Sequence, residues 1–201
     1  MLQVTRRWWL LASLSAPLAV ALGAQPLEVR LEAGNLIRIS APAFQFLAGR
    51  PLERLKNGGS VSFLGQLSLS TDAHKTIEQR VISRFALSYD IWEERFSAVR
   101  YSLSRTEEAS RKSSPLLEAA IQAWCLESLA VDASRIPLDQ PVWVRLELRL
   151  EDPHDTGGLL GEPGISISRL IDLFSRPARP SQDHWQLDAG PFRLMDLKRK
   201  S

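Results

Sequence analysis

The sequence has a single cysteine, Cys125, among its 201 residues. An intramolecular disulfide is therefore excluded, and the chain must be stabilised by its core rather than by cross-links. Its 44% hydrophobic and 24% charged residues are ordinary for a folded globular domain and argue against a disordered chain. Cys125 lies beside Trp124 within an apolar helical pattern, so we expect a buried structural thiol rather than a reactive one.

Signature motifs for catalysis or cofactor binding are also missing. The chain contains no Gly-x-Ser-x-Gly elbow, phosphate-binding loop, dinucleotide fingerprint, His-Glu-x-x-His or Cys-x-x-Cys pair. Its three histidines, His74, His154 and His184, are scattered, and none stands at metal-ligand spacing from another. A Ser-His-Asp triad assembles from distant positions, so the sequence leaves that arrangement open. We expect no cofactor and no metal, and we favour a protein without catalytic activity.

An excess of charge of either sign is absent as well. The chain holds 25 basic and 23 acidic residues, and two of the basic residues, Arg6 and Arg7, lie in an N-terminal segment that we expect to be removed. The remaining charges balance, and a basic cluster at 198–200 leaves the rest slightly acidic. No basic face for phosphate contacts is visible, so nucleic acid is not expected as a partner.

Residues 1–24 have the build of a secretory signal peptide. Arg6 and Arg7 precede the apolar run 8–23, and small residues at its end offer a cleavage site. The alternative is a retained membrane anchor, but a helix of this run spans roughly 24 Å, short of the ~30 Å hydrocarbon core. Pro17 also interrupts the run. We expect export to the periplasm or cell envelope, with no stable membrane span after cleavage.

Residues 25–201 are expected to form a single domain dominated by strands. The clearest strand covers 142–150, where an apolar residue stands at every second position. Similar alternation predicts strands at 27–32 and 60–70, and a long strand with its return strand at 76–103. Because one face of each long strand is polar, a parallel sheet buried on both faces is excluded.

Two helices and two long loops complete the expected domain. Proline at its start and glycine after its end predict a short helix at 51–56. Ser114 followed by Pro115 predicts the start of a second helix, whose apolar stripe should pack on the sheet. Loops are expected at 104–114 and 152–164. We therefore expect a single α+β domain, a twisted antiparallel meander with helices on one face, and keep a β-sandwich with helical insertions as the alternative.

An acidic corner after the long strand is the candidate partner contact. It comprises Tyr89, Asp90, Trp92, Glu93 and Glu94. The structural interpretation is a hairpin turn in which Asp90 bonds nearby amides and the aromatic rings pack on the end of the sheet. The functional interpretation is a protein interface, because an aromatic anchor ringed by carboxylates suits one. The second interpretation requires Trp92 to be exposed.

Two further groups of polar residues could bind a ligand, but an ordinary solvent-exposed surface explains both. Residues 151–155 hold three carboxylates and an imidazole, which suits calcium or zinc, but their spacing matches no metal-binding loop and a solvated turn explains them. A stripe that alternates in sign predicts cross-strand ion pairs on a solvated face rather than a groove for an anionic ligand. The stripe consists of Arg145, Glu147, Arg149 and Glu151.

Short motifs stand out in the first three quarters of the chain: the run 55–63 contains Leu-x-Asn-Gly, the run 84–90 contains Leu-Ser-Tyr-Asp, and the pair Arg95 and Phe96 follows. Together they resemble a family of exported bacterial proteins. The family is known as a domain of unknown function, and its members similarly begin with a signal peptide. The match covers 27–150 in outline. It implies an envelope location, and no functional residue is carried over from it.

We therefore expect a non-catalytic binding or accessory protein of the cell envelope, with an envelope protein as its partner. The alternative is a small-ligand carrier or an enzyme with a pocket between sheet and helix. An exposed apolar patch favours the first function. A pocket with convergent polar side chains favours the second.

Overall fold

The computed structural model describes residues 27–102, 110–115, 117–151, 174–175, 182–197 and 199–200. The expected signal peptide at 1–24 and the expected loop at 152–164 lie outside these residues. Within the described part of the chain, no helix is both long and apolar enough to cross a membrane.

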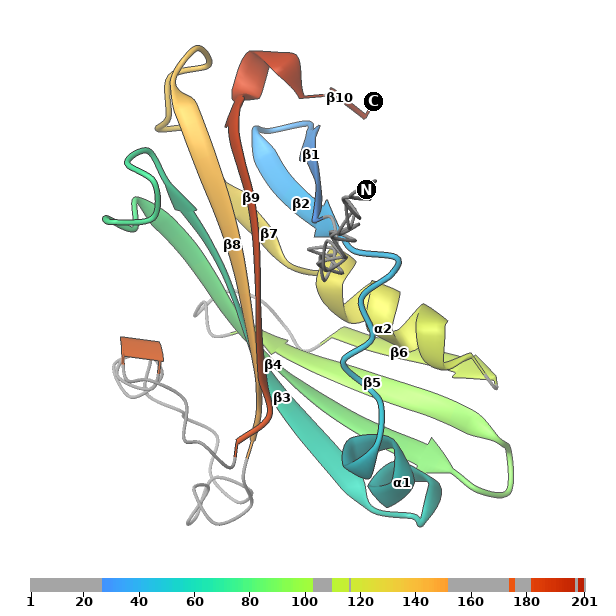
Figure 1. The fold of residues 1–201 in the computed structure, drawn as a ribbon. Helices are drawn as coiled ribbons and strands as arrows, with labels where there is room; N and C mark the ends of the chain where they lie inside the picture. The colour runs from blue at the N-terminus through green and yellow to red at the C-terminus, as the bar shows by residue number, and fades with distance from the viewer. Residues whose placement is uncertain are drawn as a thin grey trace, which may run out of the picture.

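A six-stranded antiparallel sheet forms the body of the domain (Figure 1). Its strand order is β6-β5-β4-β3-β8-β9, so four successive strands form a meander and two later strands extend it beyond β3. The bounds are β3 Ser60–Ser70, β4 Gln79–Asp90, β5 Arg95–Ser102, β6 Ser110–Pro115, β8 Pro141–Leu150 and β9 His184–Arg193. The strand predicted at 142–150 is confirmed, because its apolar residues from Val142 to Leu148 are buried at every second position.

A smaller sheet has the order β10-β1-β2-β7. Its strands are β1 Glu28–Glu32, β2 Leu36–Ser40, β7 Ala130–Asp132 and β10 Arg199–Lys200. The β1–β2 and β2–β7 pairs are antiparallel, and the β1–β10 pair is parallel. Gly34 and Asn35 both have positive φ, which lets the chain turn tightly from β1 into β2.

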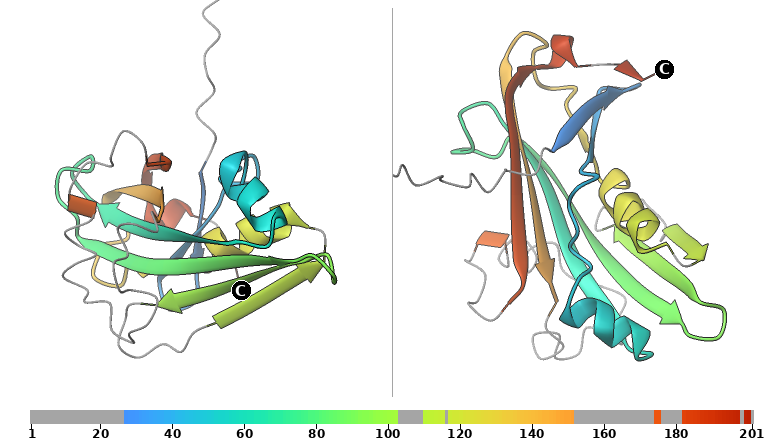
Figure 2. Two further views of the ribbon diagram at one scale, coloured as in Figure 1. Left: turned by 90° about the horizontal axis from the view of Figure 1, so that it is seen from below. Right: turned by 45° about the vertical axis from the view of Figure 1, so that its right-hand side comes forward.

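The helices and the small sheet lie together on one face of the large sheet (Figures 1 and 2). One apolar core joins these layers, with Phe63 and Phe85 from the large sheet, Ile37 from the small sheet, Leu55 from α1 and Ile121 from α2. The predicted α+β class and antiparallel meander are confirmed, although the helices share their face with three short strands and β10. The bounds are α1 Arg50–Lys56, α2 Glu118–Glu127 and a 3-10 helix, η1, Leu194–Asp196.

Two predictions near the start of α2 are wrong. The expected loop at 104–114 contains most of a strand, β6, in which Ser114 pairs with Phe96 of β5. Ser114 and Pro115 therefore do not start the helix, which begins at Glu118 without a side-chain cap. The helix does not start at Ser114 because the edge of β5 offers a row of backbone hydrogen-bond partners, and pairing with them holds this segment extended.

Cys125 is fully buried in α2. Burial raises the pKa of its thiol far above the ordinary value, so the nucleophilic thiolate is disfavoured. The predicted burial of Cys125 is confirmed.

Candidate functional site

The β4–β5 hairpin ends in a tight turn that Asp90 organises. Asp90 is the last residue of β4 and pairs with Arg95, the first residue of β5. Its Oδ1 accepts the backbone N–H groups of Trp92 at 2.9 Å and of Glu93 at 3.0 Å. Glu94 completes the turn in the left-handed region, with φ 51°. The predicted turn is present, and its backbone is fixed by hydrogen bonds to one carboxylate.

The residues of the predicted contact divide into two groups. Tyr89 is half-buried and packs on Phe96 with ring centroids 4.6 Å apart, so it belongs to the sheet. Trp92 is 95% exposed, and the three acidic residues of the corner are exposed beside it. Only Tyr89 packs on the sheet end as expected. The condition for a partner contact, an exposed Trp92, is met.

Two more apolar side chains lie exposed at this end of the molecule. Ile91 is 52% exposed and Leu117 is 56% exposed. Leu117 comes two residues after Pro115 of β6, which pairs with Arg95 at the base of the turn. We call Ile91, Trp92 and Leu117 the tip patch. Sequence reasoning missed Leu117, because its spacing matches the apolar stripe of α2.

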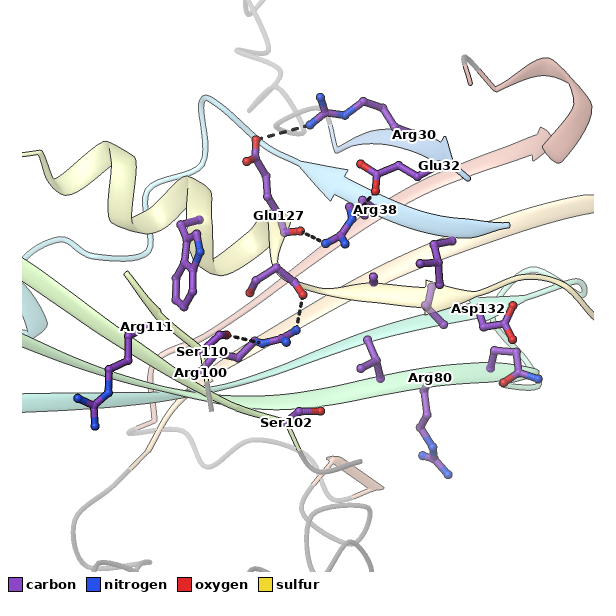
Figure 3. A pocket seen from close by; sticks show the side chains of 17 residues that line it. Arg30, Glu32, Arg38, Arg80, Arg100, Ser102, Ser110, Arg111, Glu127 and Asp132 are labelled. Atoms are coloured by element: carbon purple, nitrogen blue, oxygen red, sulfur yellow. Dashed lines mark hydrogen bonds and ion pairs between the residues drawn. The ribbon is translucent and has the colours of Figure 1, made fainter. Parts of the chain in front are cut away.

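A cavity of about 810 Å³ lies between the small sheet and the large sheet (Figure 3). Strands β1, β2 and β7 line one side, β4, β5 and β6 line the other, and the end of α2 lies between them. Two arginines at its margin, Arg80 and Arg111, direct their guanidinium groups away from α2 in Figure 3. Strand alternation explains this, because Arg80 neighbours Val81 and therefore points to the other face of the large sheet.

Three other arginines gather around the C-terminal end of α2. Arg38 donates from Nη1 to the carbonyl of Glu127 at 2.7 Å and from Nε to Glu32 Oε2 at 2.6 Å. Arg100 donates from Nη1 to the carbonyl of Ser128 at 2.6 Å. Carbonyls at a helix C-terminus lack partners within the helix and favour cations, so these bonds tie β2 and β5 to α2. No sequence signal marks these arginines, because they alternate with apolar neighbours as surface residues do.

The third arginine, Arg30, reaches the same helix end from β1. Its Nη2 lies 3.6 Å from Glu127 Oε1. Figure 3 shows the Glu127 side chain between Arg30 and Arg38. The cavity therefore combines guanidinium groups, two glutamates and the exposed carbonyls of a helix end.

The opposite face of the large sheet carries the predicted stripe of ion pairs. Arg145 binds Asp188 of β9 through two hydrogen bonds, Nε to Oδ1 at 2.7 Å and Nη2 to Oδ2 at 3.1 Å, which confirms a cross-strand pair. Glu151 accepts from Arg84 Nε at 2.7 Å, with side-chain exposures of 7% and 10%. Arg149 is buried as well. The prediction of a solvated face is therefore wrong at this end of the stripe.

Most of the acidic cluster at 151–155 lies outside the described residues. Its first member, Glu151, is described, and its carboxylate accepts a hydrogen bond from Arg84. Among the described residues, no group of three His, Cys, Asp or Glu side chains is placed to hold a metal ion.

The Arg145–Asp188 pair predicts a pH dependence of stability. Burial acts to raise the pKa of the Asp188 carboxyl, but hydrogen bonds from Arg145 and Gln186 outweigh it and hold that pKa below its ordinary value. A carboxyl with a folded pKa below its unfolded value, about 3.9, stabilises the fold above that pH, and the contribution is lost as pH falls through the folded pKa. We expect Asp188→Asn to lower the free energy of unfolding by at most about 1 kcal/mol at neutral pH. Urea unfolding from neutral to acidic pH measures whether this difference disappears.

His74 requires a control in that experiment. Its Nε2 lies 3.9 Å from Asp188 Oδ1, and its pKa is lowered by burial first and by Arg145 second. The folded state therefore favours neutral His74, which adds a separate loss of stability as pH falls below about 6.5. Carrying His74→Gln in both proteins removes this second titration. A difference that stays constant down to low pH would contradict the prediction for Asp188.

The two runs that carry the family resemblance, 55–63 and 84–90, lie together in the fold. Val61 is opposite Leu87 in the β3–β4 pair. The resemblance thus rests on the central hairpin of the sheet and the turn that Asp90 organises, which are structural features. No protein-family model, curated protein or solved structure matches this chain.

Proposed function

We propose that this protein is a non-catalytic binding protein of the cell envelope that docks a protein partner through the tip patch. The observation that supports this function is the 95% exposure of Trp92. An indole left in water forgoes the stabilisation gained by burying it, and it becomes a strong anchor when a partner covers it. Ile91 and Leu117 add two further exposed apolar side chains at this end of the sheet.

The turn that carries Trp92 is suited to docking because it is already ordered. Asp90 holds the backbone N–H groups of Trp92 and Glu93, so little conformational entropy is lost at the tip when a partner binds. Ile91 lies over the α1–β3 turn, with its Cδ1 3.4 Å from the position of a Cβ at Gly58. The anchor is therefore held on a preformed hairpin end.

The charges around the anchor indicate the chemistry of the partner. Asp90, Glu93 and Glu94 share the exposed turn with Trp92, and the only positive charge in the turn segment, Arg95, has its Nε 3.8 Å from Glu93 Oε2. An acidic rim around an apolar centre complements a protein pocket with an apolar floor and lysine or arginine at its edge. The same carboxylates oppose docking to anionic lipid headgroups.

Trp92→Ala is expected to abolish capture of a stoichiometric partner from the native cell envelope. Truncation of a central aromatic anchor costs at least about 2 kcal/mol of binding free energy, roughly 30-fold in Kd. Tagged protein is cross-linked in its own envelope, the partner is identified by mass spectrometry, and the Kd of the purified pair is measured for the parent and the variant. The intact mass of the purified chain tests export, since cleavage leaves an N-terminus at Ala24 or Gln25.

Met195→Ala is the matched control for this experiment. Met195 is 53% exposed in η1, which lies at the opposite end of the sheet (Figure 1). Its removal deletes a comparable exposed apolar side chain and should leave the Kd within about twofold. Equal binding by the parent and Trp92→Ala would overturn the proposal. Binding of the parent to anionic vesicles, lost in Trp92→Ala, would replace the protein partner with a membrane surface.

A further inference from the structure

Two arginines face each other directly in the wall of the cavity. The antiparallel register of β1 and β2 places Arg30 opposite Arg38. Like charges directly opposite on one face of a sheet repel, so this pairing is unfavourable unless negative charge lies against it. The charge that the protein supplies is the Glu127 carboxylate, 3.6 Å from Arg30, together with Glu32 on Arg38.

Arg30 is incompletely satisfied by these contacts. Its 3.6 Å ion pair with Glu127 is longer than a hydrogen bond. Its Nε is buried and has no hydrogen-bond partner in the described structure. A buried N–H group without an acceptor is destabilising, and a shift of the Arg30 side chain toward an oxygen atom in the cavity would provide one.

Arg38 is held in place beside it. Its Nε and Nη1 are fixed by Glu32 and by the Glu127 carbonyl at 2.6 and 2.7 Å. A guanidinium has five N–H donors, so these two bonds orient Arg38 and leave donors for a ligand. Pre-oriented guanidinium groups bind planar or tetrahedral oxyanions with little loss of entropy.

The acidic side chains of the cavity are already engaged by other groups. Arg30, Arg38 and Arg100 line it together with three acidic residues, while the guanidinium groups of Arg80 and Arg111 point away from α2. Glu32 and Glu127 are each paired with a guanidinium, and Asp132 accepts hydrogen bonds from Ser134. An oxyanion that enters the cavity therefore meets guanidinium N–H donors rather than free carboxylates.

The remaining lining is apolar and defines the other part of a ligand. Trp124 is half-buried beside the arginines, and Leu36, Val81 and Val131 also line the cavity. The volume of about 810 Å³ is in the range of sites for small organic molecules. An aromatic or aliphatic group of a ligand would lie against these side chains.

We infer that this cavity is a binding site for a small organic oxyanion, a carboxylate or a phosphate ester, whose oxygens lie between Arg30 and Arg38 and whose apolar part lies near Trp124. This site goes beyond the proposed function, because no residue of the tip patch lines it. The alternative function from the sequence analysis, a small-ligand carrier or enzyme, needs a pocket beside a helix. This cavity, between the two sheets and the end of α2, is where such a ligand would bind.

Titration of the full mature protein with phenyl phosphate, benzoate and inorganic phosphate tests the inference. Isothermal titration calorimetry should show saturable binding of an organic anion, tighter than that of inorganic phosphate. In ¹H–¹⁵N spectra, the Arg30 Nε–H resonance should shift downfield as it gains an acceptor, a readout that needs no variant. The preferred probe, phenyl phosphate or benzoate, distinguishes the phosphate ester from the carboxylate.

Arg30→Gln and Arg80→Gln form a matched pair for the same titration. Both remove one positive charge from the lining, but the Arg80 side chain points to the other face of the sheet. We expect the Kd to rise at least about tenfold in Arg30→Gln, the effect of losing a charged hydrogen bond, and to stay within about twofold in Arg80→Gln. Circular dichroism confirms that each variant is folded.

Three results would overturn the inference. They are absence of saturation by about 10 mM for every probe, equal weakening in both variants, and an unchanged Arg30 Nε–H resonance at saturation. Each result leaves the tip patch untouched, because partner capture is measured separately with Trp92→Ala.

Discussion

Phe63→Ala is expected to lower the free energy of unfolding by about 3–5 kcal/mol. Phe63 is fully buried in β3, which pairs with β4 on one side and β8 on the other. Its ring meets Phe46 edge-on with centroids 5.0 Å apart and lies 6.2 Å from the ring of Trp185. The space left by the ring cannot close, because its walls belong to strands held at fixed spacing by two ladders of hydrogen bonds. Urea unfolding at neutral pH, followed by far-UV circular dichroism, measures the loss.

Two variants control for effects unrelated to the cavity. Phe63→Leu keeps much of the side-chain volume and should be clearly less destabilised than the alanine variant. Met195→Ala removes an exposed side chain and should change the free energy by no more than about 0.5 kcal/mol. A loss below about 1 kcal/mol in Phe63→Ala would show that this part of the core is not packed as described.

The strands that were predicted correctly from the sequence are those with a clear alternation of apolar and polar residues within the strand. β8 alternates strictly because one face lies on the core, and such a pattern has one interpretation. The turn at Asp90 was equally predictable, because an aspartate at the end of a strand caps the following amides locally. These features depend on residues close together in the chain.

The start of α2 and the short strands β7 and β10 of the small sheet were not predictable in this way. Ser114 and Pro115 carry a good local signal for a helix start, yet pairing with β5 decides their conformation. β7 and β10 are too short to show a period of their own, and they exist because β2 and β1 offer edges to them. Competition between a local signal and a distant strand edge cannot be evaluated without knowing which strands are neighbours.

The two candidate sites also differ in whether their residues are close together in the sequence. The corner at 89–94 was identified from its composition, and only the exposure of Trp92 had to come from the structure. Arg30, Arg38 and Arg100 lie on β1, β2 and β5, and the opposition of Arg30 and Arg38 depends on register. An arginine that meets another across a sheet looks, in the sequence, the same as one that faces water.

Glu151→Gln is expected to have the second large effect, a loss of about 3–5 kcal/mol in the free energy of unfolding. The Glu151 carboxylate accepts from Arg84 Nε at 2.7 Å, and both side chains are almost fully buried. Arg84 also donates to Ser62 Oγ at 3.1 Å, so its guanidinium is held on this face of the sheet. Removing the negative charge leaves that guanidinium buried without an ionic partner among the described residues, which costs more than the pair itself contributes.

The double variant Arg84→Met with Glu151→Met separates the pair from its parts. Because two buried charges lose their hydration when they pair, replacing both with apolar side chains of similar size is expected to be less destabilising than Glu151→Gln alone. Denaturant unfolding of the parent, Arg84→Met, Glu151→Met and the double variant gives the coupling energy. A double variant that loses as much as the two single variants combined would mean that the residues act independently. In that case their burial, and not their pairing, would account for the loss in each single variant.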